Sequence, residues 1–245
     1  MFDALSAAVG VLQDAQRVVV LTGAGVSTAS GLPQFRGAGG VWDDEELMAA
    51  HDVSALPGSL DVLWATWGPL RAIVAAAQPN AAHQAIASLG QRFPGAVTVA
   101  TQNVDGFHQR AGSRVVAELH GSLFQSRCMT CDQSFSDLEV PEGIPLSPCC
   151  GAPARPDMVL FGEALPFEAS RTAKLACRAA DVLLIVGTSG AVSTASGLAR
   201  YATDYGARTV LVNLEPWGPD SSRWLTATVT GPAEELLPDL VSRLG

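Results

Sequence analysis

Residues 17–25 read RVVVLTGAG, an apolar run of strand-forming residues that ends at a glycine-rich turn. Near-continuous Val and Leu is typical of a parallel strand that is covered by helices on both faces. Similar runs occur at 96–100, 181–186 and 209–213, with weaker candidates at 115–119 and 226–229. This repetition predicts several buried parallel strands.

Helical patterns separate these strands. They lie at roughly 3–15, 80–92, 169–179, 192–206 and 233–244. Alternating strands and helices predict an α/β fold with a doubly wound parallel sheet. Such sheets bind ligands beyond the carboxyl ends of their strands. We therefore expect the ligand site among the polar and Gly-rich segments that follow the strands: 23–25, 101–105, 120–121, 187–189 and 213–215.

Two segments interrupt the alternation. Residues 37–79 contain three Trp with Gly and Pro punctuation, and they predict a helical module. Residues 121–160 contain four of the five Cys of the chain. We expect these two insertions to form a small second domain. The large domain would then consist of residues 1–36, 80–120 and 161–245.

Composition narrows the classes of function. The chain of 245 residues has 48% apolar and 16% charged residues, which excludes a disordered protein. Its 15 Lys and Arg against 24 Asp and Glu give a net charge of -9. That balance argues against nucleic-acid and membrane-surface partners, because both select cationic patches. The sequence shows no apolar run of the ~18 residues that a membrane span needs and no signal-peptide pattern, so a cytoplasmic protein is expected. The oligomeric state cannot be inferred from the sequence, and a monomer is the default.

The cysteine spacing predicts one structural zinc ion. Cys128 and Cys131 form a C-x-x-C pair, and Cys149 and Cys150 follow after 17 intervening residues. Four thiolates at about this spacing are typical of a structural zinc site. The adjacent pair is irregular, because both thiols can reach one ion only if the backbone turns sharply beside them. Cys177 falls on a predicted helix face and is expected in the core.

The segment after the first strand, residues 23–31, is a candidate phosphate-binding turn. Glycines let a backbone approach a pyrophosphate, and a helix N-terminus supplies N–H donors. An ordinary tight turn is the alternative. The dehydrogenase fingerprint G-x-G-x-x-G is absent, because Thr28 stands at its last position.

Polar residues at other strand ends are further candidates. His120 is the candidate general base, because it ends a predicted strand and an imidazole titrates near working pH. A purely structural histidine is the alternative. Asn103 and Asp105 follow another strand, where caps and turns use the same residue types.

Taken together, these motifs resemble those of the sirtuin family, the NAD-dependent protein lysine deacylases. The resemblance runs from about Val19 to Ala233. The matching motifs are Gly23-Ala24-Gly25-Val26-Ser27, Gly31-Leu32-Pro33-Gln34-Phe35-Arg36, Gln102-Asn103-Val104-Asp105, Leu119-His120-Gly121, Arg155-Pro156, Phe161-Gly162-Glu163, Gly187-Thr188-Ser189 and Asn213-Leu214-Glu215. The resemblance implies a Rossmann-like domain, with the insertions as the helical and zinc modules of the family.

The resemblance also implies roles for individual residues. NAD, as cosubstrate, would contact Gly23, Ala24, Gly25, Ser27, Phe35, Arg36, Trp42, Gln102, Asn103, Asp105, Gly187, Thr188, Ser189, Asn213, Leu214, Glu215 and Ala233. The catalytic residues would be His120, Asn103 and Asp105. The substrate peptide would pair with Val159, Phe161, Gly162 and Glu163. The zinc ligands would be Cys128, Cys131, Cys149 and Cys150.

The chemistry implied by the resemblance joins an acylated lysine of a protein or peptide to NAD. The acyl oxygen attacks the C1′ carbon of the nicotinamide ribose, and nicotinamide leaves. His120 then activates a ribose hydroxyl, and the products are free lysine and O-acyl-ADP-ribose. Zinc with four thiolates would be structural, because no coordination position stays open.

One departure bears on the acyl group. The desuccinylase-like branch of the family carries a Tyr-x-x-Arg pair, and an ungapped count places it at Ala65 and Gly68. Together with Trp64 and Trp67, these residues predict a roomy, apolar acyl pocket that accepts acetyl and other neutral acyl groups. Succinyl would be a weak substrate, because a carboxylate in an apolar pocket is costly. Alternatively, Trp64 and Trp67 are ordinary core residues of the small domain.

Three other functions compete with deacylation. An ADP-ribosyltransferase would use the same NAD cleavage but leave the label on protein. A non-catalytic NAD-binding regulator would not need His120, Asn103 and Asp105. A hydride-transferring dehydrogenase would produce NADH, but the chain lacks its fingerprint.

Overall fold

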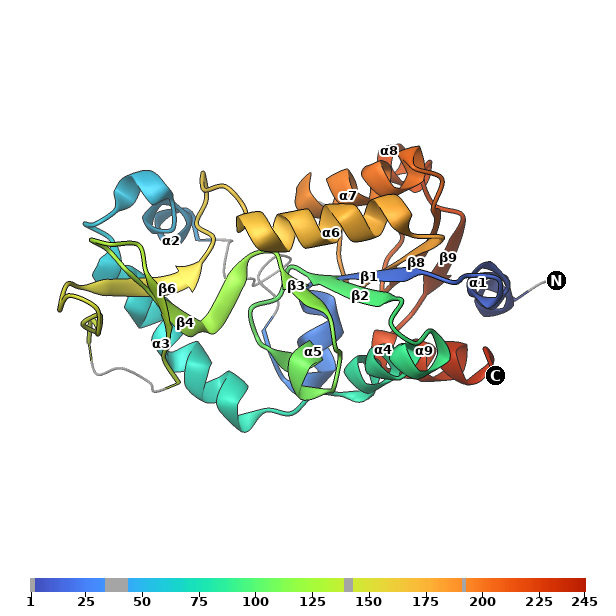
Figure 1. Ribbon diagram of the computed structural model, residues 1–245, viewed down its shortest axis with the longest axis horizontal. Coiled ribbons are helices and arrows are strands. Elements are labelled where there is room, and N and C mark those ends of the chain that lie inside the picture. The colour runs from blue at the N-terminus through green and yellow to red at the C-terminus, as the bar shows by residue number, and fades with distance from the viewer. Residues whose placement is uncertain (1–2, 34–43, 139–142, 191–192) are drawn as a thin grey trace.

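The computed structural model describes residues 3–33, 44–138, 143–190 and 193–245 (Figure 1). A six-stranded parallel sheet has the order β3-β2-β1-β7-β8-β9. Its strands are β1 Val18–Thr22, β2 Val97–Thr101, β3 Val116–Glu118, β7 Val182–Val186, β8 Arg208–Asn213 and β9 Ala227–Thr230. After β1, the chain adds β2 and β3 on one side of it. Later it adds β7, β8 and β9 on the other side. The two halves meet at the β1–β7 pair, where Thr22 lies beside Val186.

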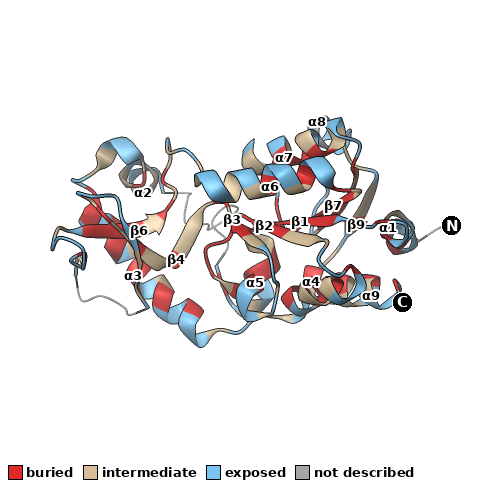
Figure 2. Cartoon of the chain, viewed as in Figure 1, coloured by how far each residue is buried: buried red, intermediate tan, exposed pale blue. Residues whose placement is uncertain are grey.

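Helices cover both faces of this sheet. Helices α1 (Ala4–Gln13), α4 (Ala81–Arg92) and α9 (Ala233–Ser242) lie on one face, and α6 (Phe167–Ala179) and α7 (Ser193–Asp204) lie on the other (Figure 1). Two short helices, α5 (Phe107–Arg110) and α8 (Pro219–Ser222), and the 3-10 helix η1 (Ala24–Ser30) also belong to this part. Side chains of β1 alternate between the two cores, because successive residues of a strand point to opposite faces. All five residues of β1 are buried, as the red strands of Figure 2 show.

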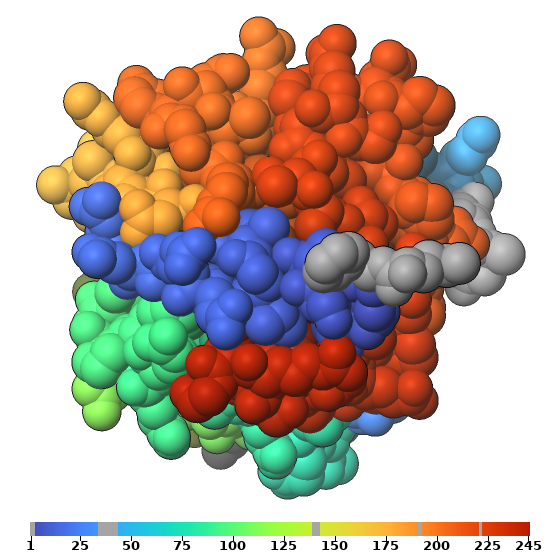
Figure 3. Space-filling model, turned by 90° about the vertical axis from the view of Figure 1, so that its right-hand side faces the viewer, coloured from blue at the N-terminus to red at the C-terminus, as the bar shows by residue number. Residues whose placement is uncertain are grey.

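The terminal helices close one end of the molecule. Helices α1 and α9 pack side by side there (Figure 3), and Arg243 contacts Asp3 at 3.4 Å. Across the described ranges, no helix combines the length and the apolar character that a membrane crossing requires.

The other end of the molecule holds a second group of elements (Figure 1). It comprises the helices α2 (Glu45–Ala50), η3 (Val53–Ala55) and α3 (Leu60–Ala76) and the strands β4 (Gly121–Cys128), β5 (Ser134–Ser136) and β6 (Ala154–Met158). The strands form an antiparallel sheet of order β5-β4-β6. A separate core joins α3 to this sheet through Leu63, Trp67, Leu123 and Met158.

These observations confirm the predicted fold class, and every predicted strand of the parallel sheet is present within two residues. The antiparallel sheet was not predicted. Its strands carry Ser, Arg and Pro among few apolar residues, so no alternating pattern marks them. The division into a large domain and a small domain of two modules stays a prediction.

A buried ion pair ties α3 to Asp137, the residue that follows β5. Arg71 is fully buried, and its guanidinium lies 2.8 Å from the Asp137 carboxylate. The same guanidinium donates hydrogen bonds to the Leu123 carbonyl at 2.7 Å and to the Ser126 hydroxyl at 3.1 Å. Trp64 stacks beneath it at 4.8 Å. The Asp137 carboxylate and groups of β4 thus satisfy the charge of Arg71.

We expect Arg71→Met to lower the free energy of unfolding by about 3–5 kcal/mol, because it leaves a mostly buried carboxylate without its cation. Denaturant unfolding would measure the change. Arg200→Met is the matched control: Arg200 is 66% exposed and lies 3.8 Å from Asp204, so a change within about 0.5 kcal/mol is expected. Equal stability of the two variants would contradict a structural role for the buried pair.

Candidate active site

A cleft of about 890 Å³ lies at the carboxyl ends of the parallel strands, between the two groups of elements. Most of the residues predicted to bind ligands line it. They are Gly23, Ala24, Gly25, Gln102, Asn103, His120, Val159, Phe161, Gly162, Glu163, Gly187, Thr188, Ser189, Asn213, Leu214, Glu215 and Ala233. Phe35, Arg36 and Trp42 lie outside the described residues. The volume of the cleft is sufficient for a ligand of dinucleotide size, since pockets for drug-sized ligands have volumes of about 300–1,000 Å³.

The turns after β1 and β7 touch through their backbones at the floor of this cleft. The Gly25 N–H donates to the Gly187 carbonyl at 2.9 Å, and the Gly23 N–H donates to the Val186 carbonyl at 3.1 Å. A Cβ atom on Gly25 would lie 2.8 Å from the Gly187 oxygen, closer than real Cβ atoms come. Gly187 also has φ +60°. These glycines therefore allow the two chain segments to approach each other closely. Backbone atoms rather than side chains then form the surface of the cleft at this point.

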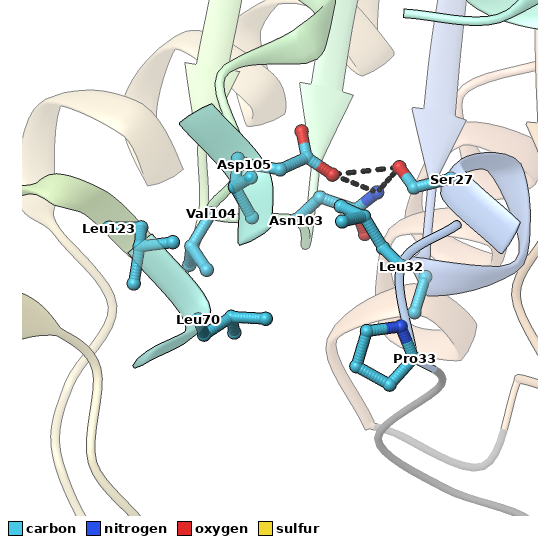
Figure 4. A pocket seen from close by; sticks show the side chains of 10 residues that line it. Ser27, Leu32, Pro33, Leu70, Asn103, Val104, Asp105 and Leu123 are labelled. Carbon is cyan, nitrogen blue, oxygen red and sulfur yellow. Dashed lines mark hydrogen bonds between the residues drawn. The ribbon is translucent and has the colours of Figure 1, made fainter. Parts of the chain in front are cut away.

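A polar triad lies beside the cleft, at a small cavity of about 20 Å³ (Figure 4). The Ser27 hydroxyl donates to Asp105 Oδ2 at 2.7 Å, and the Asn103 amide donates to Ser27 Oγ at 3.0 Å. Asp105 Oδ1 accepts the N–H of Phe107 at 2.9 Å, which fixes the carboxylate. The facing walls are apolar and include Leu32, Pro33, Leu70, Val104 and Leu123. A carboxylate and an amide held between apolar walls suit a small planar amide group.

Two buried histidines, His83 and His108, lie close to this triad. His83 Nε2 donates to Ser27 Oγ at 3.4 Å, because the Ser27 proton is already given to Asp105. His108 Nε2 lies 2.8 Å from the Thr22 hydroxyl, and the two imidazole rings are 5.0 Å apart. Burial lowers the pKa of His83 to about 4 and that of His108 to about 3, where the neighbouring His83 adds to the effect. Both rings are neutral at pH 7 and act as structural hydrogen-bonding groups.

His120 presents a basic nitrogen to the cleft. Its Nδ1 donates to the Gln102 carbonyl at 3.0 Å, so the neutral ring keeps its lone pair on Nε2. Burial lowers the pKa of His120 below 6.5, and the bond to Gln102 opposes that shift. The ring is therefore neutral at pH 7, the state a general base requires. Gly121 follows with φ +80°, and a side chain at this position would also collide with the backbone of Asp157.

The segment after β6 runs along the cleft from Val159 to Glu163. The Val159 N–H donates to the carbonyl of His120 at 3.0 Å, and the Phe161 N–H donates to the carbonyl of His51 at 2.9 Å. The Glu163 carboxylate is bound on both oxygens, to Arg155 at 2.6 Å and to the Leu160 N–H at 2.8 Å. Glu163 therefore shapes this segment through its side chain. Pairing of the segment with a peptide stays a prediction.

The structure does not bring the predicted acyl-pocket residues to the cleft. The Trp64 indole N–H donates to the Ala154 carbonyl of β6 at 2.8 Å, and Ala65 is exposed. Trp67, one helical turn along α3, lines the cleft instead and also belongs to the core. Of the residues predicted to wall the acyl pocket, the cleft lining thus includes Trp67 but not Trp64, Ala65 or Gly68, and the acyl pocket itself stays a prediction. The ungapped count gave no information about which face of α3 turns toward the cleft.

Several lining residues were not predicted. They are His51, Met158, Leu165, Ser193, Thr194 and Gly231. No ligand-binding pattern marked these positions in the sequence. His51 lies in the helical module, whose path over the cleft depends on tertiary packing.

The four clustered cysteines are positioned to bind a zinc ion. Their Sγ atoms all lie within 4.8 Å of one another. A tetrahedral site with Zn–S distances of about 2.3 Å requires such a cluster of thiolates. The turn that the adjacent pair needs is present: Gly151 adopts φ +71°, and its N–H donates to the Ser147 carbonyl at 2.9 Å. The Ser147 hydroxyl, 3.2 Å from Sγ, lowers the pKa of Cys128 to about 5 and so favours the thiolate that binds metals.

The remaining cysteine is separate from this cluster. Cys177 is fully buried on α6 in the core beside the sheet. Burial raises the pKa of its thiol to about 12. It is a packing residue, as the sequence predicted.

Comparison with known proteins identifies similar sequences and structures. The model of the Sir2 family matches residues 23–194. An NAD-dependent protein deacylase of Pyrobaculum aerophilum is 43% identical over 238 residues, which is 96% of this chain and 93% of that protein.

Solved structures agree with these matches. A variant of a Sir2 homologue in complex with ADP-ribose aligns with a TM-score of 0.90 at 34% identity, over 100% of this chain and 96% of that one. A Sir2 protein bound to an acetylated peptide aligns with a TM-score of 0.82 at 28% identity, over 96% of this chain and 95% of that one.

Proposed function

This chain belongs to the Sir2 family, and from that premise we propose that it removes acetyl and other neutral acyl groups from lysine side chains of proteins, with NAD as cosubstrate. The observation that carries the proposal is the position of His120. A neutral imidazole with its basic Nε2 lines the same cleft as the glycine turns after β1 and β7. A base and a backbone surface suited to phosphates thus share one site.

Different residues along the cleft would bind different parts of NAD. The backbone N–H groups and Thr188 beside the β1 and β7 turns would hold the phosphates, and Asn213 to Glu215 would hold the adenosine end. Gln102 is fixed for contact with ribose hydroxyls, because its amide donates to the Thr188 hydroxyl at 3.2 Å. Asn103 and Asp105 would orient the nicotinamide carboxamide in the small cavity of Figure 4.

NAD supplies a glycosidic bond whose cleavage drives the acyl transfer, and the residues of the chain act around it. His120 Nε2 would take the proton of a ribose hydroxyl, while the Gln102 carbonyl steadies the protonated ring through Nδ1. The apolar walls of Val104, Leu160 and Trp67 would keep water from the reacting carbon. The substrate peptide would pair with the backbone near Gly162, a mode that tolerates many side chains.

The preference for neutral acyl groups follows from the charges of the wall. No Lys or Arg occurs among the described residues that line the cleft. Arg71, the buried cation of α3, is bound to Asp137 and to the β4 backbone and cannot serve a carboxylate substrate. An acidic acyl group would lose its hydration without gaining a counter-ion.

The four cysteines would hold zinc as a structural ion at the far end of β4 and β6. Four thiolates leave no position for a substrate. A cytoplasmic location and a monomeric state stay predictions.

A panel of peptides of one sequence, each with NAD and one acyl-lysine, tests the proposal by mass spectrometry. We expect loss of acetyl, butyryl and crotonyl groups together with formation of O-acyl-ADP-ribose, and at least tenfold slower loss of succinyl. Turnover of succinyl at the same rate would contradict the charge argument. Label from NAD that ends on protein would favour an ADP-ribosyltransferase, and binding of NAD without turnover would favour a regulator.

A further inference from the structure

Arg155 is a buried cation that has no part in the chemistry proposed above. It lies on β6 and is 4% exposed. Its guanidinium donates to the Met158 carbonyl at 3.0 Å and to the Glu163 carboxylate at 2.6 Å. A buried charge needs such partners, because it is costly to remove from water without them. The two partners stand at the two ends of the segment that runs along the cleft, residues 159–163.

This segment closes on itself as a tight turn. The Glu163 N–H donates to the Leu160 carbonyl at 3.1 Å, and the second oxygen of the Glu163 carboxylate accepts the Leu160 N–H at 2.8 Å. Inside the turn, Gly162 has φ +83°, a backbone conformation that glycine adopts readily. Glu163 thus binds both backbone groups of Leu160, and Arg155 fixes the carboxylate that does so.

The turn also has a fixed place at the edge of the cleft. Residues 159–163 all line the cleft, and they are the residues predicted to pair with the substrate peptide. Backbone bonds join them to the rest of the protein, from the Val159 N–H to the His120 carbonyl and from the Phe161 N–H to the His51 carbonyl. Pairing with a peptide needs N–H and carbonyl groups at fixed positions, because hydrogen bonds are short and directional. The shape of the turn therefore controls how well a peptide can pair.

We propose that Arg155 is a positioning residue for the acylated peptide: through Met158 and Glu163 it holds the 159–163 segment in the shape that pairs with the substrate. The segment is then ordered in the free protein, so binding of the peptide does not lose affinity by ordering it. Arg155 acts on peptide affinity rather than on the reacting atoms, since it is not among the described residues that line the cleft. The inference rests on the proposed deacylase function and adds a residue that acts through others.

The neighbouring strand offers a matched control. Arg127 of β4 stands opposite Arg155 in the antiparallel sheet, and its guanidinium lies 2.8 Å from the carboxylate of Asp157 on β6. Its second ionic partner is Asp132 at 3.5 Å. Both partners lie outside the 159–163 segment. Replacement of Arg127 therefore removes an ion pair from the same sheet without releasing the turn.

The test measures steady-state kinetics with one acetyl-lysine peptide and NAD. For Arg155→Met we expect the KM for the peptide to rise about tenfold or more, the effect of losing one charge-assisted hydrogen bond. The KM for NAD should stay within about a factor of two, because the NAD site is not held by this turn. Arg155→Lys keeps the charge without the fork that reaches both partners, and it should recover part of the peptide affinity. Arg127→Met should keep both wild-type KM values.

Equal increases of the two KM values in Arg155→Met would indicate general damage and would overturn the proposal. The same rise of the peptide KM in Arg127→Met would also overturn it. Zinc content and thermal unfolding of each variant would be measured on the same preparations. If Arg155→Met does not fold, Arg155→Lys serves for the same comparison, because it retains a buried cation beside Glu163.

Amide hydrogen exchange provides a readout that needs no turnover. The Leu160 N–H should exchange about tenfold faster in the Arg155 variants than in the wild type, while the amides of β1 and those of Arg127→Met keep their wild-type rates. Unchanged exchange of Leu160 in a folded Arg155 variant would reject the role of Arg155 alone. Absence of turnover for every acyl group by the wild type would instead reject the deacylase function, so the two failures are distinguishable.

Discussion

Replacement of His120 by Ala is expected to lower kcat/KM for deacylation by about 10²–10⁴-fold, the usual contribution of a positioned general base. The variant should fold normally, because the only described partner of the ring is the Gln102 carbonyl at 3.0 Å and the ring is partly exposed to the cleft. Its melting temperature should stay close to that of the wild type. Rapid-quench assays of O-acyl-ADP-ribose would measure the loss.

The pH dependence of the wild type provides an independent check. The base works in its neutral form, so kcat/KM should fall as the pH decreases and the ring becomes protonated. Because burial lowers the pKa of His120, this acid limb should lie below pH 6.5 and should be absent from the residual activity of His120→Ala. A variant with more than a tenth of wild-type turnover, or an acid limb above pH 6.5, would contradict the assignment.

Replacement of Cys128 by Ser is expected to remove the bound zinc and to lower the free energy of unfolding by about 4 kcal/mol or more, among the largest effects of single substitutions. Cys128 is the buried member of the cluster, and its Sγ accepts the N–H groups of Thr130 and Cys131 at 3.4 and 3.5 Å. Loss of this ligand frees the ends of β4 and the following loop. Metal analysis and thermal unfolding of the same preparations would measure both effects.

Cys177→Ala is the matched control for this experiment. It also removes a buried thiol, but from the core of α6 and far from the cluster. We expect full zinc content and a loss of about 1 kcal/mol in this control, typical of a small change in packing. Zinc content that is equal in Cys128→Ser and Cys177→Ala would show that Cys128 is not a ligand.

The parallel sheet could be predicted because its environment constrains its sequence. A strand covered by helices on both faces must be apolar throughout, and β1 and β7 are buried at every residue. The functional residues then follow at one edge of the sheet, because parallel strands all end on the same side. That geometry explains why the positions of His120, Asn103 and the glycine turns were accessible from sequence.

The group of elements around α3 and the antiparallel sheet was harder to predict, because its contacts are irregular. The wall of the cleft depends on the rotation of α3 about its axis, and the sequence places Trp64 and Trp67 equally well on a buried face. The structure separates them: Trp64 bonds to Ala154 and Trp67 reaches the cleft. Likewise, nothing in the local sequence pairs Glu163 with Arg155 or sets His51 beside Phe161.

The backbone contact between the β1 and β7 turns limits how this protein can change over evolutionary time. Gly25 and Gly187 press against each other so closely that neither position has room for even a methyl group. A substitution in one turn would push the other away, and both would then lose their shared surface at the floor of the cleft. The two turns are therefore free to vary only together. Adaptation to new substrates has far more room on the opposite wall, where side chains such as His51 and Trp67 form the surface.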